Sequence, residues 1–303
     1  MVPSYSMRGV WLVAILISCL MYSPAVAQDV GPAARPAAQP VATGQQPPAQ
    51  SAYRVAERSA PIQPAKSPDF GTAEPGEHPL MPALRWAYSG VDGIEKISDY
   101  SATLVKRERI NGTLREHQYM FVKIRHDPFS VYMYFLGPPD LKGQEVAFIE
   151  GQNNGKMWAQ GTGFQKTMFG TVALRPDGLV AMKGQRYPLT ELGMLNMVRR
   201  LIEVAEHDVT KGECEVKFFK GAKVNDRSCT CIQVIHPVPR RDFLFHKARI
   251  FVDDELNMPV RYESYDWPKA PGEKPGLLEE YTYLNIKLNN KFTDDDFDKN
   301  NFK

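Results

Sequence analysis

The sequence lacks the features that define most large functional classes. Its 37 Lys and Arg residues nearly balance its 35 Asp and Glu residues, so the formal net charge is only +2. Without a strong positive field, no nucleic-acid partner is predicted. The chain also has no G-x-S-x-G, H-E-x-x-H or phosphate-binding glycine-loop motif. We therefore predict a protein that is not an enzyme, with no catalytic residue and no cofactor.

Long apolar runs are scarce as well. The run at residues 9–21 follows Arg8 and is too short to cross a bilayer as a permanent helix, so it predicts a removable export signal. The small-x-small site at residues 25–27 predicts a signal peptide of residues 1–27 and an exported protein of the periplasm or cell envelope. The alternative is a lipobox that ends at Cys19 and would produce a membrane-anchored lipoprotein.

The segment that follows has few large apolar residues. Residues 28–78 are rich in Ala, Pro, Gln and Ser, as in GPAARPAAQPVATGQQPPAQ. Such a segment buries too little apolar surface to offset the entropy of ordering, which predicts a flexible linker. The remaining residues 79–303 have the length of one domain with a sizeable core.

Cysteine is rare, with four residues in the chain. Once Cys19 is assigned to the signal, Cys214, Cys229 and Cys231 remain, and an oxidising compartment favours one disulfide and one free thiol. Cys229 and Cys231 lie two apart in a predicted strand and point to the same face, so a bridge is expected to involve Cys214. A zinc set with His236 lacks paired C-x-x-C spacing, and no metal is predicted.

Periodicity in the domain predicts two amphipathic helices and a meander of strands. The first helix carries an apolar stripe at helical spacing, formed by Leu84, Ala87, Tyr88, Val91 and Ile94. The second follows Pro188, and its stripe consists of Leu192, Leu195, Val198, Leu201, Ile202 and Ala205. Turn signals such as Asn111-Gly112 separate the extended segments, which are residues 100–110, 114–125, 129–136, 145–150, 156–160, 215–220, 228–235, 244–252, 259–265 and 279–288.

The strand FSVYMYFL, residues 129–136, is apolar or aromatic on both faces. One face holds Phe129, Val131, Met133 and Phe135, and something must cover each side. One interpretation is a central strand between helices and a loop. The other is a cavity for an apolar ligand, lined by these four residues together with Met120, Val122 and Ile124 of the preceding strand. The pairs His126-Asp127 and His207-Asp208 are interpreted as structural.

The pattern predicts the α+β class, with about ten antiparallel strands in one sheet. KARIFVDDELNMPVRYESYD resembles a hairpin of the LolA, LolB and RseB lipoprotein-carrier superfamily. VKIRHDPFSVYMYF, NNGKMWA and YLNIKLNNKFTDDDF resemble other parts of that fold. More closely, residues 85–303 resemble a family of exported bacterial proteins common in planctomycetes, whose function is not established.

The resemblance implies a curved β half-barrel with helices packed on its concave face and a hydrophobic cavity. It also implies a lipid, acyl chain or lipoprotein as ligand, with a membrane surface as a possible second partner. Two functions stay open. One is a carrier-like protein that binds an apolar ligand; the other is an envelope scaffold or sensor with a filled core.

Overall fold

The structure is a computed structural model that describes residues 69–212 and 214–303. The predicted signal peptide, Cys19 and most of the predicted linker lie outside these residues. Phe70 is buried and stacks near Phe218 and Trp86, with ring centroids 5.0 and 5.2 Å away. The packed domain therefore begins before the predicted boundary at residue 79, because one aromatic side chain of that segment enters the core.

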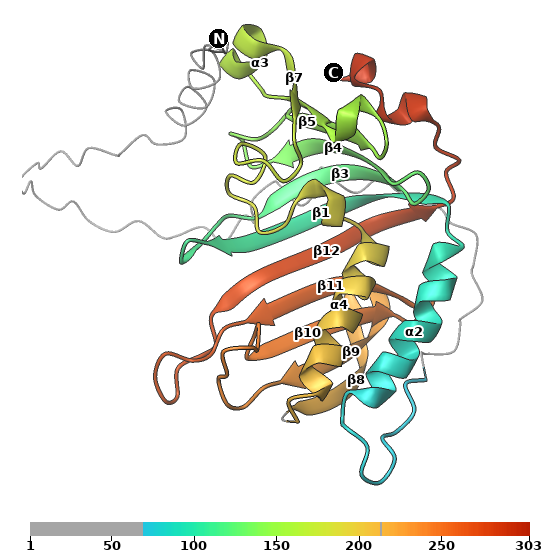
Figure 1. Ribbon diagram of the computed structural model, residues 1–303, viewed down its shortest axis with the longest axis vertical. Helices are drawn as coiled ribbons and strands as arrows, with labels where there is room; N and C mark the ends of the chain where they lie inside the picture. Colours follow the sequence, from blue (N-terminus) through green and yellow to red (C-terminus); the bar gives the residue numbers. More distant parts are fainter. Residues whose placement is uncertain (1–68, 213) are drawn as a thin grey trace, which may run out of the picture. The chain divides into compact units, whose positions relative to one another are not determined.

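The described chain is built around a single antiparallel sheet of 12 strands (Figure 1). Its strands follow the order β7-β6-β5-β4-β3-β1-β12-β11-β10-β9-β8, and β2 pairs only with β1. The bounds are β1 Asp99–Ile110, β2 Thr113–Leu114, β3 Gln118–Arg125, β4 Ser130–Gly137, β5 Glu145–Ile149, β6 Met157–Gln160, β7 Thr171–Leu174, β8 Glu215–Val224, β9 Arg227–Ile235, β10 Lys247–Asp253, β11 Met258–Tyr265 and β12 Leu277–Leu288.

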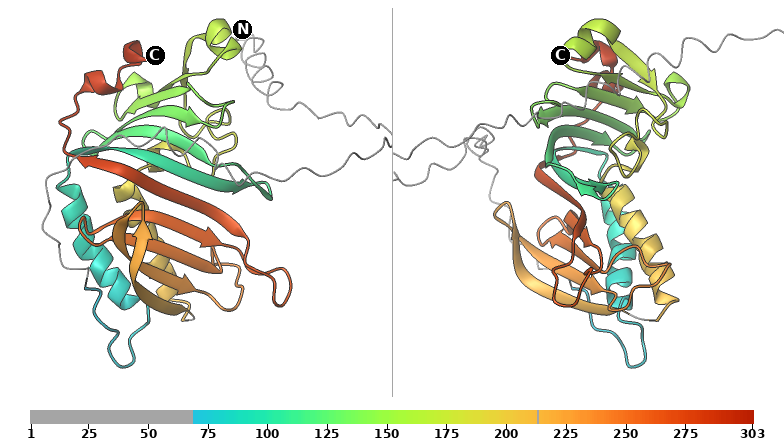
Figure 2. Two further views of the ribbon diagram at one scale, coloured as in Figure 1. Left: turned by 180° about the vertical axis from the view of Figure 1, so that it is seen from behind. Right: turned by 90° about the vertical axis from the view of Figure 1, so that its left-hand side faces the viewer.

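Two long helices lie on the same face of the curved sheet, side by side over β8 to β12 (Figures 1 and 2). They are α2 (Met81–Glu95) and α4 (Met194–Val209), and the short α3 (Phe164–Phe169) precedes β7. The predicted α+β class, with an open curved antiparallel sheet and packed helices, is confirmed. The remaining short elements are the 3-10 turns η2 Asn153–Gly155, η3 Leu189–Glu191, η4 Asp294–Phe297 and η5 Lys299–Asn301.

The main core lies between the helices and the middle of the sheet. Strand alternation places Tyr100, Ala102 and Leu104 of β1 on the helix side, where they pack with Val198 and Ile202 of α4. Of the stripe predicted for the second helix, Leu195, Val198 and Ile202 are buried, Leu201 and Ala205 are half-buried, and Leu192 lies before the start of α4. In α2 the prediction is only partly right, since Trp86 is buried whereas Tyr88 is 48% exposed.

The other face of β4 is covered by the end of the chain. Phe302 packs near Tyr132, with ring centroids 6.2 Å apart, and Lys303 Nζ lies 5.3 Å from the centre of the Tyr134 ring. The 3-10 turn η4 also contacts β4. The two-faced apolarity of this strand thus has a structural cause, because β4 is packed on both sides.

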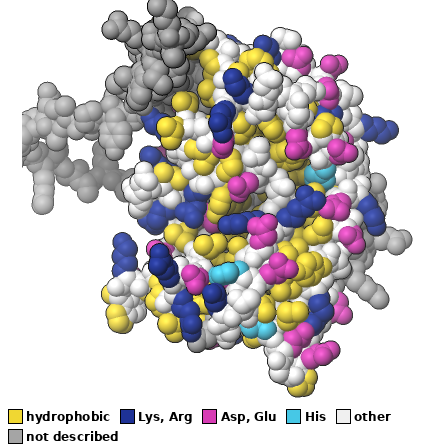
Figure 3. Space-filling view, viewed as in Figure 1, with side chains coloured by type: hydrophobic (Ala, Val, Ile, Leu, Met, Phe, Trp, Pro, Cys, Tyr) yellow, Lys and Arg dark blue, Asp and Glu magenta, His cyan; other side chains and the backbone are white. Residues whose placement is uncertain are grey.

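No helix among the described residues has the length and apolarity needed to cross a membrane. The surface shown in Figure 3 carries hydrophobic, basic and acidic side chains that alternate over short distances. No charge of one sign dominates this face, in keeping with the near-balanced composition.

Candidate functional site

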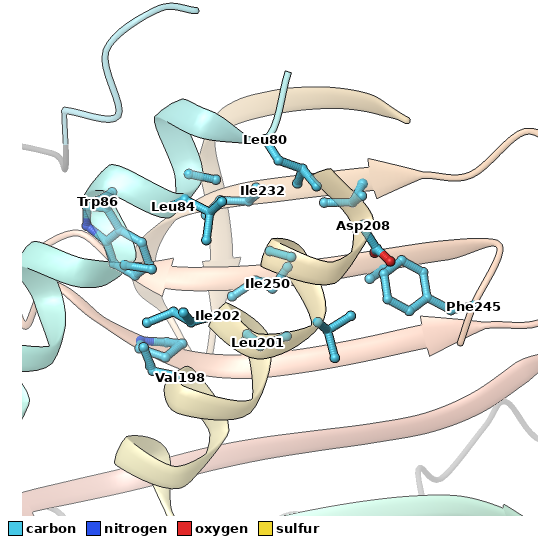
Figure 4. Close-up of a pocket in the computed structure, with 17 residues that line it drawn as sticks. Leu80, Leu84, Trp86, Val198, Leu201, Ile202, Asp208, Ile232, Phe245 and Ile250 are labelled. Carbon is cyan, nitrogen blue, oxygen red and sulfur yellow. The ribbon is translucent and has the colours of Figure 1, made fainter. Parts of the chain in front are cut away.

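A cavity of about 70 Å³ lies between the helix pair and the C-terminal half of the sheet (Figure 4). Its walls come from α2, α4, β9, β10 and β11, and nearly all of the lining is apolar. The lining residues are Leu80, Ala83, Leu84, Trp86, Ala87, Val198, Leu201, Ile202, Val204, Ala205, Asp208, Ile232, Val234, Phe245, Ala248, Ile250 and Pro259.

Helical spacing explains the wall formed by α4. Val198, Leu201, Ala205 and Asp208 recur every three or four residues, so they lie along one face of the helix. The opposite wall follows from strand alternation. Ile232 and Val234 of β9 are two apart, as are Ala248 and Ile250 of β10, so both pairs point to the helices.

Trp86 is held in the wall by a polar anchor outside it. Its indole Nε1 donates a hydrogen bond to Asn257 Oδ1 at 2.9 Å, while the ring lines the cavity. Asn257 has a φ of 53°, a conformation that asparagine tolerates better than most residues. The hydrogen bond fixes the orientation of the indole ring, so the ring keeps its place in the cavity wall.

One lining residue carries charge. Asp208 lies beside Phe245, on the opposite side of the site from Trp86 (Figure 4). Its side chain is 4% exposed, and its Oδ2 lies 3.1 Å from Nε2 of His236, which is fully buried. His236 donates from Nδ1 to the Phe245 carbonyl at 3.0 Å, since a carbonyl oxygen accepts, and its ring stacks on Phe243. The cavity is therefore apolar and ends at the buried pair of Asp208 and His236.

A cysteine and a histidine meet near this end, with Cys214 Sγ 4.0 Å from His78 Nε2. His78 Nδ1 accepts a hydrogen bond from the Leu80 backbone N–H, so Nε2 carries the proton of the neutral ring. Burial raises the pKa of the Cys214 thiol to about 12 and lowers the pKa of His78. This pair is not arranged as an activated nucleophile and base, because such a base must accept the thiol proton.

The predicted disulfide is wrong, because Cys214, Cys229 and Cys231 are all free thiols. Phe219 of β8 pairs with Cys231, and Cys214 lies five positions before Phe219, which is roughly 16 Å along a strand. A disulfide needs Cα atoms within about 7 Å. Cys214 also packs with the helix-facing cluster, whereas Cys229 belongs to a small cluster with Val224 and Val260.

The seven residues predicted to line a cavity lie together, but in the main core. The β3–β4 register pairs Met120 with Phe135, Val122 with Met133 and Ile124 with Val131, as the alternation predicts. Of the seven, five are at most 6% exposed, and Phe129 and Met133 pack against them. None lines the cavity described above. A ligand at these residues stays a prediction that requires their packing to open.

A second buried cluster was not predicted. Glu108 and Glu279 are paired across β1 and β12 and are 5% and 3% exposed. Arg186 Nε lies 2.8 Å from Glu279, and Lys106 Nζ lies 3.3 Å from Glu108. Burial raises the pKa of Glu279.

Each carboxylate in this second cluster faces one cation. Tyr187 also donates to Glu279, so the pairs fix the segment before α4 to the sheet. The sequence does contain a sign of this cluster, namely a charged residue on the core-facing side of each strand. Glu108 lies four residues after Leu104 in β1, and Glu279 lies four residues before Tyr283 in β12, so each glutamate shares a face with a buried core residue.

Comparison with known proteins gives one family. Residues 97–303 match the family described as "Protein of unknown function (DUF1571)". This range falls within residues 85–303, for which the sequence resembles a family without an established function. No curated protein matches the chain.

Solved structures similar to this chain include three bacterial proteins. Lipoprotein LppX from Mycobacterium tuberculosis is 11% identical, with a TM-score of 0.40 and coverage of 69% of this chain and 96% of that chain. A LolA superfamily protein from Nitrosomonas europaea is 12% identical, with a TM-score of 0.31 and coverage of 71% and 98%. A DUF1329 family protein from Desulfovibrio piger is 11% identical, with a TM-score of 0.37 and coverage of 75% and 100%.

Proposed function

We propose that this chain, which belongs to the DUF1571 family, is a non-catalytic protein of the cell envelope that binds a lipid, an acyl chain or a lipidated protein. The observation that carries the proposal is the apolar cavity between α2, α4 and the sheet. Apolar concavities with few polar groups are the usual form of sites for small apolar ligands. The envelope location rests on the predicted signal of residues 1–27.

The cavity is smaller than such a ligand. A volume of about 70 Å³ is roughly half of the ~150 Å³ that accommodates benzene in an engineered cavity. A longer chain therefore enters only if the helices move away from β9, β10 and β11. The two helices are joined at their exposed edges by the pairs Arg199–Glu95 and Tyr88–Glu206, which favours their movement as a unit.

The small volume also favours a second candidate function. A scaffold or sensor domain that acts through protein contacts needs only a filled core, and the main core around β1, β3 and β4 is filled. In that case the cavity is an ordinary packing defect. The two functions differ in whether the cavity takes up an apolar molecule.

A filling variant separates the two functions. Ala205 lines the cavity, and Ala205→Leu adds three carbon atoms to its space. We expect the wild-type protein to bind the neutral fluorophore Nile red saturably, as followed by the emission of the dye, and Ala205→Leu to weaken binding at least about tenfold. Ala173→Leu makes the same change at an exposed position of β7 and should bind like the wild type.

Organic extracts of the purified protein provide a second readout. Mass spectrometry should detect a lipid at near-stoichiometric amount in the wild type, and much less in Ala205→Leu. Absence of saturable Nile red binding, or equal binding by Ala205→Leu and the wild type, would favour the scaffold.

A further inference from the structure

We propose that two loops at one edge of the sheet dock the protein on an anionic lipid surface, with one end of the cavity beside that surface. The loops are residues 236–246, between β9 and β10, and residues 266–276, between β11 and β12. We call these two loops the docking edge. The proposal goes beyond ligand binding, because it concerns where the protein contacts a bilayer.

The two loops leave the sheet from one row of residues. The register aligns the terminal residues of β9, β10, β11 and β12, which are Ile235, Lys247, Tyr265 and Leu277. His246 links the loops, because its backbone N–H donates to the Tyr265 carbonyl at 2.9 Å and its ring centroid lies 6.0 Å from that of Trp267. Both loops therefore project from the same edge, at the lower left of Figure 1.

The first loop is anchored by aromatic side chains and exposes aliphatic ones. Phe243 and Phe245 are each 6% exposed, whereas Leu244 between them is 57% exposed and Val238 is 52% exposed. The ring of Phe243 stacks on that of His236, with centroids 4.0 Å apart. The loop is thus held in place, and folding makes little use of the apolar surface of Leu244 and Val238.

Basic residues accompany these apolar side chains. The docking edge contains Arg240, Arg241, Lys269 and Lys274, against Asp242, Asp266 and Glu273. Lys211, from outside the loops, pairs with Asp242 at 3.3 Å. Arg241, Lys269 and Lys274 are exposed and have no ion pair within residues 69–212 and 214–303. Figure 3 shows several basic side chains at the lower left, where the loops lie.

A lipid surface fits this combination of side chains. Unpaired Lys and Arg residues are attracted by anionic head groups, and an exposed aliphatic side chain enters the boundary between head groups and acyl chains. Leu244 and Val238 supply the second contact beside the cations that supply the first. The turn at the opposite end of β10 and β11 is acidic, with Asp253, Asp254 and Glu255, so an anionic surface favours the docking edge over that turn.

Docking at this edge brings the cavity close to the bilayer. Phe245 lines the cavity beside Asp208 (Figure 4), while the preceding residue, Leu244, faces solvent. A lipid that leaves the bilayer near Leu244 therefore meets the end of the cavity at Phe245.

Sedimentation with lipid vesicles tests the proposal on the protein from residue 28 onwards, the predicted exported form. Vesicles of phosphatidylcholine alone are compared with vesicles that also contain about 30% phosphatidylglycerol, at about 0.1 M salt. We expect the anionic vesicles to bind at least about tenfold more tightly, and the difference to shrink at about 0.5 M salt because salt screens the attraction. Equal binding to the two kinds of vesicle, or binding to neither, would overturn the proposal.

Two variants locate the contact, and both change exposed side chains. Leu244→Ser removes the apolar contact, and Arg241→Glu combined with Lys269→Glu reverses two unpaired cations. Each variant should weaken binding to the anionic vesicles at least about tenfold.

Matched controls make the same changes at exposed positions outside the docking edge. Leu179→Ser, at a side chain that is 94% exposed, and Lys96→Glu combined with Lys291→Glu should both bind like the wild type. Equal losses in the variants and their controls would contradict the assignment to the docking edge.

The cavity variant separates this proposal from the proposed function. Ala205→Leu fills the cavity and leaves both loops unchanged, so it should bind the vesicles like the wild type even if the cavity takes up no ligand. Loss of vesicle binding in Ala205→Leu would assign that binding to the cavity and overturn the docking edge.

Discussion

At the scale of single residues, burial rather than pairing determines the chemistry of the cysteines. Cys229 and Cys231 are adjacent on one side of β9, as two-residue spacing predicts, and neither approaches Cys214. The sequence could place two thiols on one face, but the position of the third depends on the register between β8 and β9. That register follows from the two-residue turn at Asn225 and Asp226, whose φ values are 48° and 65°, and from an irregularity between Phe219 and Ala222. The sequence analysis did not identify this turn.

Thiol labelling measures this directly. Burial raises the pKa of Cys214 to about 12 and the pKa values of Cys229 and Cys231 to about 11, so little thiolate forms near pH 8. We expect all three to react slowly with a maleimide in the native protein. In guanidinium chloride without reductant all three should react fully, as located by peptide mass spectrometry. A labelled fraction near one in three after unfolding, restored by a reductant, would reveal a disulfide.

At the scale of elements, repeating patterns were predicted better than short or irregular ones. The apolar stripe of α4 and the alternation of β3 and β4 span several turns or residue pairs, so each residue reinforces the same assignment. The short helix α3 and strand β7 were missed. Phe164 and Met168 of α3 are 60% and 57% exposed, so no buried stripe marks this helix. β7 has only four residues at the edge of the sheet.

The start of α4 depends on one glycine that the periodicity does not reveal. Gly193 has φ 115° and ψ 156°, a region that is essentially restricted to glycine. A Cβ there would also lie 3.3 Å from the Tyr100 hydroxyl, which accepts a hydrogen bond from the Met194 N–H at 2.8 Å. Tyr100 is fully buried, so it has little room to move.

We therefore expect Gly193→Ala to lower the free energy of unfolding by about 1–3 kcal/mol, because the backbone is strained and the contact that begins α4 is disturbed. Gly93→Ala provides the control. Gly93 lies inside α2 with open space around its Cβ position, and alanine should stabilise the protein by about 0.4–1 kcal/mol. Urea unfolding followed by circular dichroism gives both values. Equal effects of the two substitutions would contradict this account of Gly193.

At the scale of the whole molecule, different segments of the chain cover the two faces of the sheet. The helices cover one face along β8 to β12, and the C-terminal segment covers the other face at β4 (Figure 1). The sequence predicted the sheet and the helices because local periodicity encodes both. It did not predict the position of the cavity, since that requires α2, α4 and β9 to β11, which are distant in the chain, to pack imperfectly against one another.

The strand pair β3–β4 illustrates the same difficulty. Met120, Val131 and their partners have the composition of a ligand-binding surface and the burial of an ordinary core. An apolar side chain that faces a neighbouring helix is the same in sequence as one that faces a ligand. Only the packing between elements distinguishes a filled region from an open one.

Hydrogen exchange with and without a bound amphiphile distinguishes the two locations in the intact protein. If an alkyl chain enters between the helices and the sheet, α2 and α4 must first separate from β9, β10 and β11, and these amides should change in protection when hexadecanol binds. The amides of β3 and β4 should not change, because their core is filled.

Ala205→Leu is the control for this measurement, since it occupies the cavity and should abolish the changes in α2 and α4. Changes confined to β3 and β4 would instead favour a ligand at Met120, Val122, Ile124 and Met133. Such a result requires the main core to open, and Met133→Ala would then weaken binding with little loss of stability. If the main core stays closed, the same truncation lowers the free energy of unfolding by up to about 2–5 kcal/mol and leaves hexadecanol binding unchanged.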